Sequence, residues 1–371
     1  MNYGMLILSY ALCFVPITVM FAIMPYIGRK TVCFGISIPS GQHDKEELAV
    51  LRRGYARNVS IIGAVMTAVY VALVFILEAY VVMILMGVFM LVYLTAVYSL
   101  YLRRWRQVKV LKARYGWETE SRGAAVADTR FSAVRRAVSP AWFVLHVIII
   151  LATVLIGVLM YDQIPDKVVQ QTDLAGNVTR LAEKSFGLIL FAPVTQVFML
   201  LVFAFIYWSM LKAPPVLDPD NPEISSRQNA ASRYRWSAWL VAFGALLLLT
   251  LFAVQLALLQ LVDPMMISWA SMIATGLGVV SALIIAMVTG QSGSRVRLGK
   301  RADGEVIRRD DDKYWKWGVY YVNRDDPALF VEKRFGVGFT INFGRPAAIF
   351  MMIGLLVLIA VFSYVLPALL K

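Results

Sequence analysis

Apolar residues along this 371-residue chain gather into long blocks that are separated by polar and charged segments. A helix needs roughly 20 consecutive apolar residues to cross the hydrocarbon core of a bilayer. Eight blocks meet that length, so the sequence predicts an all-α membrane protein, a polytopic bundle of about eight transmembrane helices. The predicted spans are Tyr3–Ile27, Val59–Leu77, Val81–Leu102, Ala141–Tyr161, Phe186–Leu211, Ala238–Leu261, Met265–Val288 and Ala347–Leu370.

Two pairs of spans are separated by only a few residues, around Glu78–Tyr80 and around Val262–Pro264. A single merged helix would be far longer than the bilayer requires, and it would place an acidic side chain in lipid, where an exposed charge is costly. We therefore expect a tight helical hairpin at each junction. The first span lacks the basic start and the cleavage site of a signal peptide, so we expect it to remain as an anchor.

Lysine and arginine residues lie almost entirely on one side of the predicted bundle. Basic loops are retained in the cytoplasm, so we expect both termini outside a bacterial cell membrane and the four large loops inside. Contact with anionic lipid head groups accounts for the net charge of +13, and we expect no nucleic-acid partner. Every basic residue lies in the loops 29–57, 103–138, 212–235 and 291–345, except Lys167, Arg180, Lys184 and Lys371.

Small residues repeat every four positions along two of the predicted spans. Helices associate in lipid through close packing of small side chains, so we expect both spans in the interior of the bundle. The stripe in the seventh span comprises Ala270, Ala274, Gly278, Ala282 and Ala286, and the stripe in the second comprises Ala64, Ala68 and Ala72.

The sequence contains no recognised catalytic or metal-binding motif. There is no HExxH, no GxSxG, no phosphate-binding loop and no dinucleotide turn. With two histidines and two cysteines in the whole chain, we expect no metal site and no cofactor. Ionisable residues inside the spans are nearly confined to His146, which argues against a proton-coupled transporter. The loose candidates for an enzymatic site are His146, Gln171, Asp173 and Glu183.

The last basic loop changes character after residue 312. Residues 291–312 are polar and charged and are interpreted as a linker, whereas Trp315, Trp317, Val319 and Tyr321 alternate with other residues. Two further extended runs follow, with turn residues between them, so the sequence predicts a three-stranded antiparallel β-meander on the cytoplasmic side. Residues 31–39 form a similar short run, and we hypothesise that they add a fourth strand that brings Ser37 close to Thr340.

The loop at residues 161–185 has a recognisable order of residues: Tyr161, Ile164-Pro165, Asp173, Gly176 and Lys184-Ser185 before a helix. This order resembles the outer loop of SdpI-like bacterial membrane proteins. The family is named for a member that protects its producer against a secreted antimicrobial toxin, so the resemblance implies a loop that meets a peptide toxin or a membrane-protein partner. The family usually has a histidine five residues before the glycine, where this chain has Gln171.

A second resemblance concerns Trp317-Gly318, Tyr320-Tyr321, Asn323, Asp325–Pro327, Lys333–Gly336 and Thr340–Asn342, together with Phe34-Gly35 through Pro39. These residues resemble a small domain of unknown function that is often joined to such proteins. The two resemblances imply two sets of candidate interaction residues. The outer-loop set is Tyr161, Pro165, Gln171, Asp173, Gly176 and Lys184, and the inner-sheet set is Trp317, Tyr320, Asn323, Asp326, Arg334 and Asn342.

The predicted organisation is a membrane bundle of seven helices at 1–290, a cytoplasmic linker and β-meander at 291–346, and an eighth transmembrane helix at 347–371. Our first functional hypothesis is a non-enzymatic membrane protein for envelope defence, antimicrobial-peptide immunity or signalling. The alternative is a transporter or facilitator for a small molecule or a lipid, which the eight spans and the proline-containing helices favour. A membrane-embedded enzyme is the third.

Overall fold

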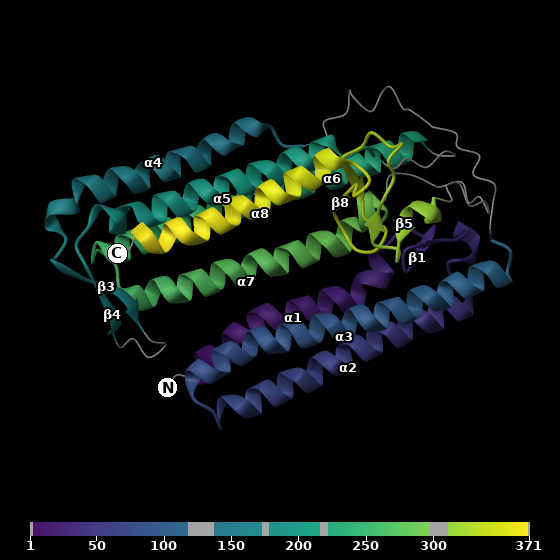
Figure 1. Ribbon diagram of the computed structural model, residues 1–371, viewed down its shortest axis with the longest axis horizontal. Helices are drawn as coiled ribbons and strands as arrows, with labels where there is room; N and C mark the ends of the chain where they lie inside the picture. The colour runs from purple at the N-terminus through teal and green to yellow at the C-terminus, as the bar shows by residue number, and fades with distance from the viewer. Residues whose placement is uncertain (1–2, 118–136, 173–177, 216–221, 297–310, 370–371) are drawn as a thin grey trace.

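The computed structural model describes residues 3–117, 137–172, 178–215, 222–296 and 311–369. Within these residues, eight helices are long and apolar enough to cross a membrane, so the protein is an all-α, multi-pass membrane protein as predicted. The helices run side by side, with small β-hairpins at both ends of the bundle (Figure 1). They are α1 (Tyr3–Ile27), α2 (Glu46–Val74), α3 (Ala79–Arg114), α4 (Val144–Leu159), α5 (Phe186–Lys212), α6 (Pro222–Leu258), α7 (Pro264–Thr289) and α8 (Pro346–Leu369).

Three helices extend well beyond their predicted spans into polar sequence. The helix α2 begins at Glu46, α3 continues to Arg114, and α6 begins at Pro222. In the added part of α2, Leu48, Arg52 and Tyr55 are buried and recur at helical spacing. A polar segment therefore continues as helix where one of its faces still packs against the protein.

Both predicted tight hairpins are present, between α2 and α3 and between α6 and α7. Asp263 precedes α7 directly, and its carboxylate accepts a hydrogen bond from the backbone N–H of Met265 at 2.7 Å. An acidic N-cap satisfies a free backbone donor and interacts favourably with the positive end of the helix dipole. Asp263, the acidic residue that argued against a merged helix, therefore caps α7 at the junction.

The helices form two groups that α7 joins. The first group is α1, α2 and α3, and the second is α4, α5 and α6. The helix α7 contacts both α1 and α6, and α8 contacts α5 at the edge of the second group. Figure 1 shows α7 running between the two groups along the whole bundle.

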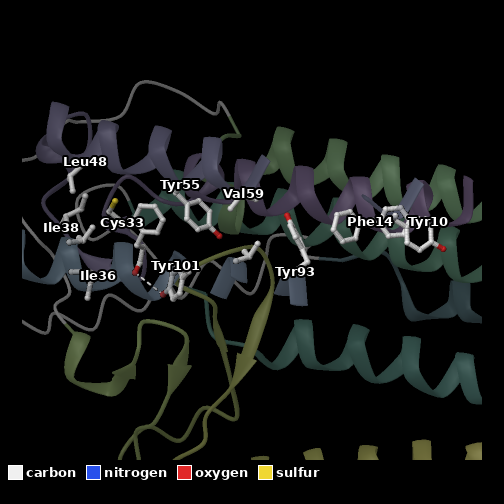
Figure 2. Close-up of a cluster of buried hydrophobic side chains, with 14 of the residues drawn as sticks. Tyr10, Phe14, Cys33, Ile36, Ile38, Leu48, Tyr55, Val59, Tyr93 and Tyr101 are labelled. Atoms are coloured by element: carbon white, nitrogen blue, oxygen red, sulfur yellow. Dashed lines mark hydrogen bonds between the residues drawn. The ribbon is translucent and has the colours of Figure 1, made fainter. Parts of the chain in front are cut away.

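A column of buried aromatic side chains fills the first group. Tyr10 stacks on Tyr70 with ring centres 3.8 Å apart, and Phe14 lies 4.7 Å from Tyr93. The column continues through Tyr93 toward Tyr101 along the helix axes (Figure 2). Because these rings come from all three helices, their stacking fixes the rotation of each helix within the group.

Most of the small-residue stripe in α7 lies inside the bundle, as predicted, although Ala282 is half-buried and Ala270 is exposed. Ala274, Gly278 and Ala286 are buried. A Cβ atom at Gly278 would collide with the ring of Phe243 on α6, so the absence of a side chain allows the two helices to approach.

The prediction for the second span is wrong. Ala64, Ala68 and Ala72 are exposed on the outer face of α2. The buried face of this helix carries larger residues, including Tyr55, Val59 and Tyr70. Aromatic packing against α1 and α3 outweighs the small-residue pattern, which leaves the alanines on the face turned away from the protein.

The beginning of α1 and the end of α8 lie at the same end of the bundle, which we call the terminal end (Figure 1). There, β3 (Lys167–Thr172) and β4 (Val178–Glu183) form an antiparallel hairpin between α4 and α5. The opposite end, from which the basic loops emerge, is called the basic end. It carries β1 (Val32–Cys33), β2 (Ile36–Ser37), β5 (Trp315–Lys316), β6 (Tyr320–Tyr321), β7 (Phe330–Glu332) and β8 (Phe339–Ile341).

The predicted three-stranded meander is correct for its second and third strands, which pair antiparallel as β7 and β8, and wrong for its first strand. The first predicted strand folds back on itself as the hairpin β5–β6, because Trp317 and Gly318 have positive φ values of 53° and 71°. The strands β7 and β8 form a second hairpin, and one parallel bridge between Tyr321 and Asn342 joins the two. The alternation of aromatic residues concealed the turn within the first run.

The predicted fourth strand is also wrong. Residues 31–39 form their own hairpin, in which Ser37 pairs with Val32, while Thr340 pairs with Val331. The β1–β2 loop consists of Phe34 and Gly35, both with positive φ, which is typical of a two-residue hairpin turn. The segment does contact the C-terminal hairpins, but through its turn and not by strand pairing.

We expect Gly278→Ala to lower the free energy of unfolding by about 1–3 kcal/mol, because the added methyl group overpacks the α6–α7 contact. The Phe243 ring stacks on Trp239 with ring centres 4.9 Å apart, which limits its freedom to move aside. Gly87→Ala in α3 is the matched control, since nothing lies within 4 Å of a Cβ atom there. Thermal unfolding in detergent measures both, and equal losses of stability would contradict the prediction.

Candidate functional sites at the two ends of the bundle

The β3–β4 hairpin stands on a base of buried apolar side chains. Ile164 and Val168 pack with Leu188 and Ile189 of α5 and with Leu259, which follows α6. Beyond this base, Lys167 pairs with Glu183 across the two strands. The base fixes the hairpin relative to the ends of the second helix group.

Two of the predicted outer-loop residues meet at the foot of the hairpin. The Tyr161 ring stacks on the Phe186 ring with centres 4.3 Å apart, and the Lys184 ammonium group lies 4.8 Å from the centre of the Tyr161 ring. A cation over an aromatic face is a favourable contact. Phe186 is 63% exposed, so this surface offers aromatic area beside a positive charge. We call Tyr161, Lys184 and Phe186 the hairpin patch.

The other predicted outer-loop residues lie elsewhere or outside the described residues. Pro165 is exposed at the start of the hairpin, and Gln171 pairs with Arg180 in the β3–β4 register. Asp173 and Gly176 fall among residues 173–177, outside the described part of the chain. Sequence reasoning missed Phe186, whose only signal was its place as the first residue of α5.

At the basic end, one buried carboxylate contacts both helix groups. Glu332, the last residue of β7, is 5% exposed. It pairs with Arg29, just beyond α1, and it accepts a hydrogen bond from Asn229 Nδ2 of α6 at 2.6 Å. Arg233 of α6 places Nη2 at 3.7 Å from Glu332 Oε1. Because α1 and α6 belong to different groups, the side chain of Glu332 connects the groups directly.

A second ion-pair cluster ties the C-terminal hairpins to the β1–β2 turn. Arg334 pairs with Asp311 and Asp312, and its Nη1 donates to the backbone oxygen of Gly35 at 3.0 Å. Asp312 also accepts a hydrogen bond from Lys112 Nζ of α3 at 2.7 Å. Burial alone would raise the pKa of Asp312, but Arg334 and Lys112 outweigh it and hold that pKa below its ordinary value.

The hydroxyl of Tyr101 joins two turns that are far apart in the sequence. It lies 3.2 Å from the backbone oxygen of Phe34 and 3.0 Å from that of Trp317, and the first of these contacts is drawn in Figure 2. A Cβ atom at Gly35 would lie 2.6 Å from the Gly318 oxygen. Glycine at both turns therefore permits the backbones to approach each other over Tyr101.

Three of the predicted inner-sheet residues hold the C-terminal hairpins together. Asn342 is fully buried, and its Nδ2 lies within hydrogen-bond distance of the backbone oxygens of Asn323 (2.8 Å), Asp326 (3.2 Å) and Ala328 (3.1 Å). Its Oδ1 accepts a hydrogen bond from the Asn323 N–H at 3.0 Å. Asp326 accepts from the Tyr321 hydroxyl at 2.8 Å. Asn323, Asp326 and Asn342 are thus engaged in internal bonds.

The remaining inner-sheet candidates divide by exposure. Trp317 and Tyr320 are exposed and contact each other edge to face, with ring centres 6.0 Å apart. Arg334 is buried in the cluster described above. Sequence reasoning missed Glu332 and its partner Arg29. The available signal was the charged run that begins at Glu332 directly after an apolar strand.

Two of the loose candidates for an enzymatic site, His146 and Glu183, lie at opposite ends of the bundle. His146 is fully buried near the start of α4, beside Gly244 of α6, at the basic end. Glu183 lies in the hairpin at the terminal end, on the far side of the bundle. Among the described residues, no group of three or more histidine, cysteine or acidic side chains is arranged to hold a metal ion.

Two family models match parts of the chain. A domain of unknown function, DUF1648, matches residues 148–197, which run from α4 through the β3–β4 hairpin into α5. A family of unknown function, DUF5808, matches residues 324–349, which include β7, β8 and the start of α8. No curated protein and no solved structure matches the chain. The two matches coincide with the hairpin unit and with the segment that carries Glu332 and Arg334.

We expect Glu332→Gln to lower the free energy of unfolding by about 3 kcal/mol or more, because it leaves Arg29 and Arg233 without their buried counter-charge. Glu223→Gln is the matched control. Glu223 pairs with Arg227 at 2.7 Å on the exposed surface of α6, and a surface pair contributes less than about 1 kcal/mol. Thermal unfolding of the two purified variants makes the comparison. A loss for Glu332→Gln no larger than that of the control would show that the buried carboxylate does not connect the groups.

Proposed function

We propose that this protein is a non-enzymatic protein of the bacterial cell membrane that acts in envelope defence. In this proposal the hairpin patch faces the outside and meets a membrane-active peptide or a membrane-protein partner. One observation carries the proposal: the DUF1648 match covers a helix–hairpin–helix unit in which the β3–β4 hairpin connects α4 to α5 and the hairpin patch lies at the foot of the hairpin. The SdpI-like order of residues in the same segment supports the same interpretation.

The chemistry of the hairpin patch suits a cationic, amphipathic peptide. Phe186 and Tyr161 offer exposed aromatic area, the kind of surface that contributes most at protein interfaces. Two aspartates lie close to the patch along the backbone: Lys184 Nζ donates to the backbone oxygen of Asp162, and the Lys184 N–H donates to that of Asp166. Both aspartates are exposed and attract a positively charged partner, whereas Glu183 lies opposite Lys167 in the strand register.

The hairpin also offers backbone hydrogen-bonding groups. Within the described residues it is a two-stranded sheet, so each strand has only one neighbour. An extended peptide can add to such an edge through main-chain hydrogen bonds. Strand addition and aromatic contact together give a mode of recognition that needs no catalytic residue.

The alternative function, a facilitator for a small molecule or a lipid, is favoured by polar residues buried among α4, α5 and α6. Gln196 is fully buried and donates to the backbone oxygen of Leu248 at 2.9 Å. Gln255 is fully buried beside Gly157, and its amide has no hydrogen-bond partner among the described residues. Polar groups at this depth commonly mark a pathway. Loss of solute uptake on deletion, with peptide susceptibility unchanged, would favour this alternative over envelope defence.

The proposed orientation predicts a labelling pattern. Glu183→Cys, in the hairpin, is expected to react with a membrane-impermeant maleimide in intact cells, whereas Arg106→Cys, exposed on α3 at the basic end, is expected to react only after permeabilisation. The parent chain is the control, because Cys13 lies within α1 and Cys33 is buried. The reverse pattern would place the hairpin inside the cell and overturn the proposal.

Deleting the gene is expected to increase the susceptibility of the native host to cationic amphipathic peptides, and the intact gene is expected to restore resistance. Phe186→Ala is expected to restore it poorly, because loss of an aromatic anchor weakens binding about tenfold. Tyr80→Ala is the matched control, since Tyr80 is 63% exposed at the same end of the bundle but lies outside the hairpin.

Growth inhibition across a panel of peptides gives the measurement, with membrane levels of each variant compared by immunoblot. Unchanged susceptibility of the deletion strain to every peptide would refute envelope defence. Full restoration of resistance by Phe186→Ala would show that the hairpin patch is not the site that meets the peptide.

A further inference from the structure

A pocket of about 530 Å³ lies at the basic end, where the C-terminal hairpins meet α8. Arg324, from the segment after β6, forms one wall. Phe343 and Arg345, which follow β8, and Ile349 and Phe350, from the first turn of α8, form the rest. The pocket therefore lies where the segment after β8 enters α8, a membrane-crossing helix.

The charge of this pocket is positive and is not balanced within it. Arg345 Nη1 donates to the backbone oxygen of Arg324 at 3.3 Å, which brings the Arg345 guanidinium group to the segment that carries Arg324, and both residues line the pocket. In the described part of the chain, neither guanidinium group forms an ion pair with a carboxylate. Asp325 is exposed next to Arg324, and the carboxylate of Asp326 accepts from Tyr321 and from the Ala328 N–H. Two guanidinium groups in this arrangement favour an anion, above all a phosphate.

The start of α8 adds to the positive potential. The helix begins at Pro346, beside Arg345, and runs for 24 residues. Its dipole places partial positive charge at this end, where anions are favoured. The pocket thus combines two side-chain cations with the positive end of a long helix.

The apolar part of the pocket distinguishes a lipid from a free phosphate ion. Phe350 is 72% exposed, and the main contact of α8 with the bundle is along α5, so most of the apolar surface of α8 lies open beside the pocket. Because this surface faces the bilayer, a phospholipid can place its head group in the pocket and its acyl chain along α8, whereas a free phosphate ion makes no use of the apolar surface.

We propose that this pocket binds the phosphate head group of an anionic phospholipid, whose acyl chain lies along the exposed face of α8. A zwitterionic lipid fits less well, because its terminal ammonium group would approach two arginines. The site uses no residue of the hairpin patch, so the proposal is independent of the proposed function.

Native mass spectrometry of the purified full-length protein, titrated with phosphatidylglycerol or phosphatidylcholine, tests the proposal. The wild-type protein is expected to retain phosphatidylglycerol about tenfold more strongly, since each arginine near an anionic lipid contributes to the affinity. The double variant Arg324→Ala/Arg345→Ala is expected to lose this preference. Arg103→Ala/Arg106→Ala, which removes the same charge from the exposed surface of α3 at the same end, is expected to keep it.

Equal retention of the two lipids by the wild-type protein would overturn the proposal, as would an equal loss of preference in both double variants. Soluble glycerol 3-phosphate is added as a competitor in a separate arm. Displacement of phosphatidylglycerol by an equal concentration of this competitor would identify a phosphate site without a lipid and overturn the commitment to a lipid.

Thermal unfolding of the wild-type protein in each lipid requires no variant, and identical stabilisation by both lipids would count against the proposal in the same way.

Discussion

The architecture of the basic end depends on one buried carboxylate between cations from two different helix groups. Glu332 is almost fully enclosed, and an isolated charge in such a place would be strongly destabilising. Arg29 from the end of α1, which is half-buried, and Arg233 from α6, which is buried, supply the compensation. The two helix groups can therefore pack together at this end only when β7 places Glu332 between them. Inside lipid, apolar surfaces gain little by meeting one another, so a polar contact outside the spans has a large influence on how the groups are arranged.

The number of helices followed from the sequence because span length is set by the thickness of the bilayer, which every apolar block must match. The tight junctions followed as well, since Asp263 cannot lie in lipid and caps α7 instead. The failures had a different origin. The alanine stripe of α2 is a true small-residue pattern, but the aromatic column through Tyr10, Tyr70 and Tyr93 decides which face of that helix is buried. The column forms only when the three helices pack together, so the residue pattern of any one helix does not predict it.

The candidate residues were predicted unevenly for a related reason. Tyr161 and Lys184 lie close in sequence to the strands that carry them, and their proximity needed only a hairpin. At the basic end, the pattern of residues around Asn342 was visible, but its role was not. The Asn342 side chain is buried and bonded to several backbone groups. The sequence alone does not distinguish such an asparagine from an exposed one that binds another molecule. The pairing of Glu332 with Arg29 spans most of the chain, and no local pattern indicates it.

The meeting of two turns over Tyr101 bears on how the protein is synthesised. The first turn, Phe34-Gly35, leaves the ribosome early, while the turn that contacts it, Trp317-Gly318, is translated only after seven helices are available for insertion. Until then the N-terminal hairpin lacks the backbone that covers its tip, and Tyr101 has only one of its two carbonyl neighbours. A chain truncated near residue 311 would therefore lose more than its last helix. It would also leave the earliest-made part of the protein incomplete.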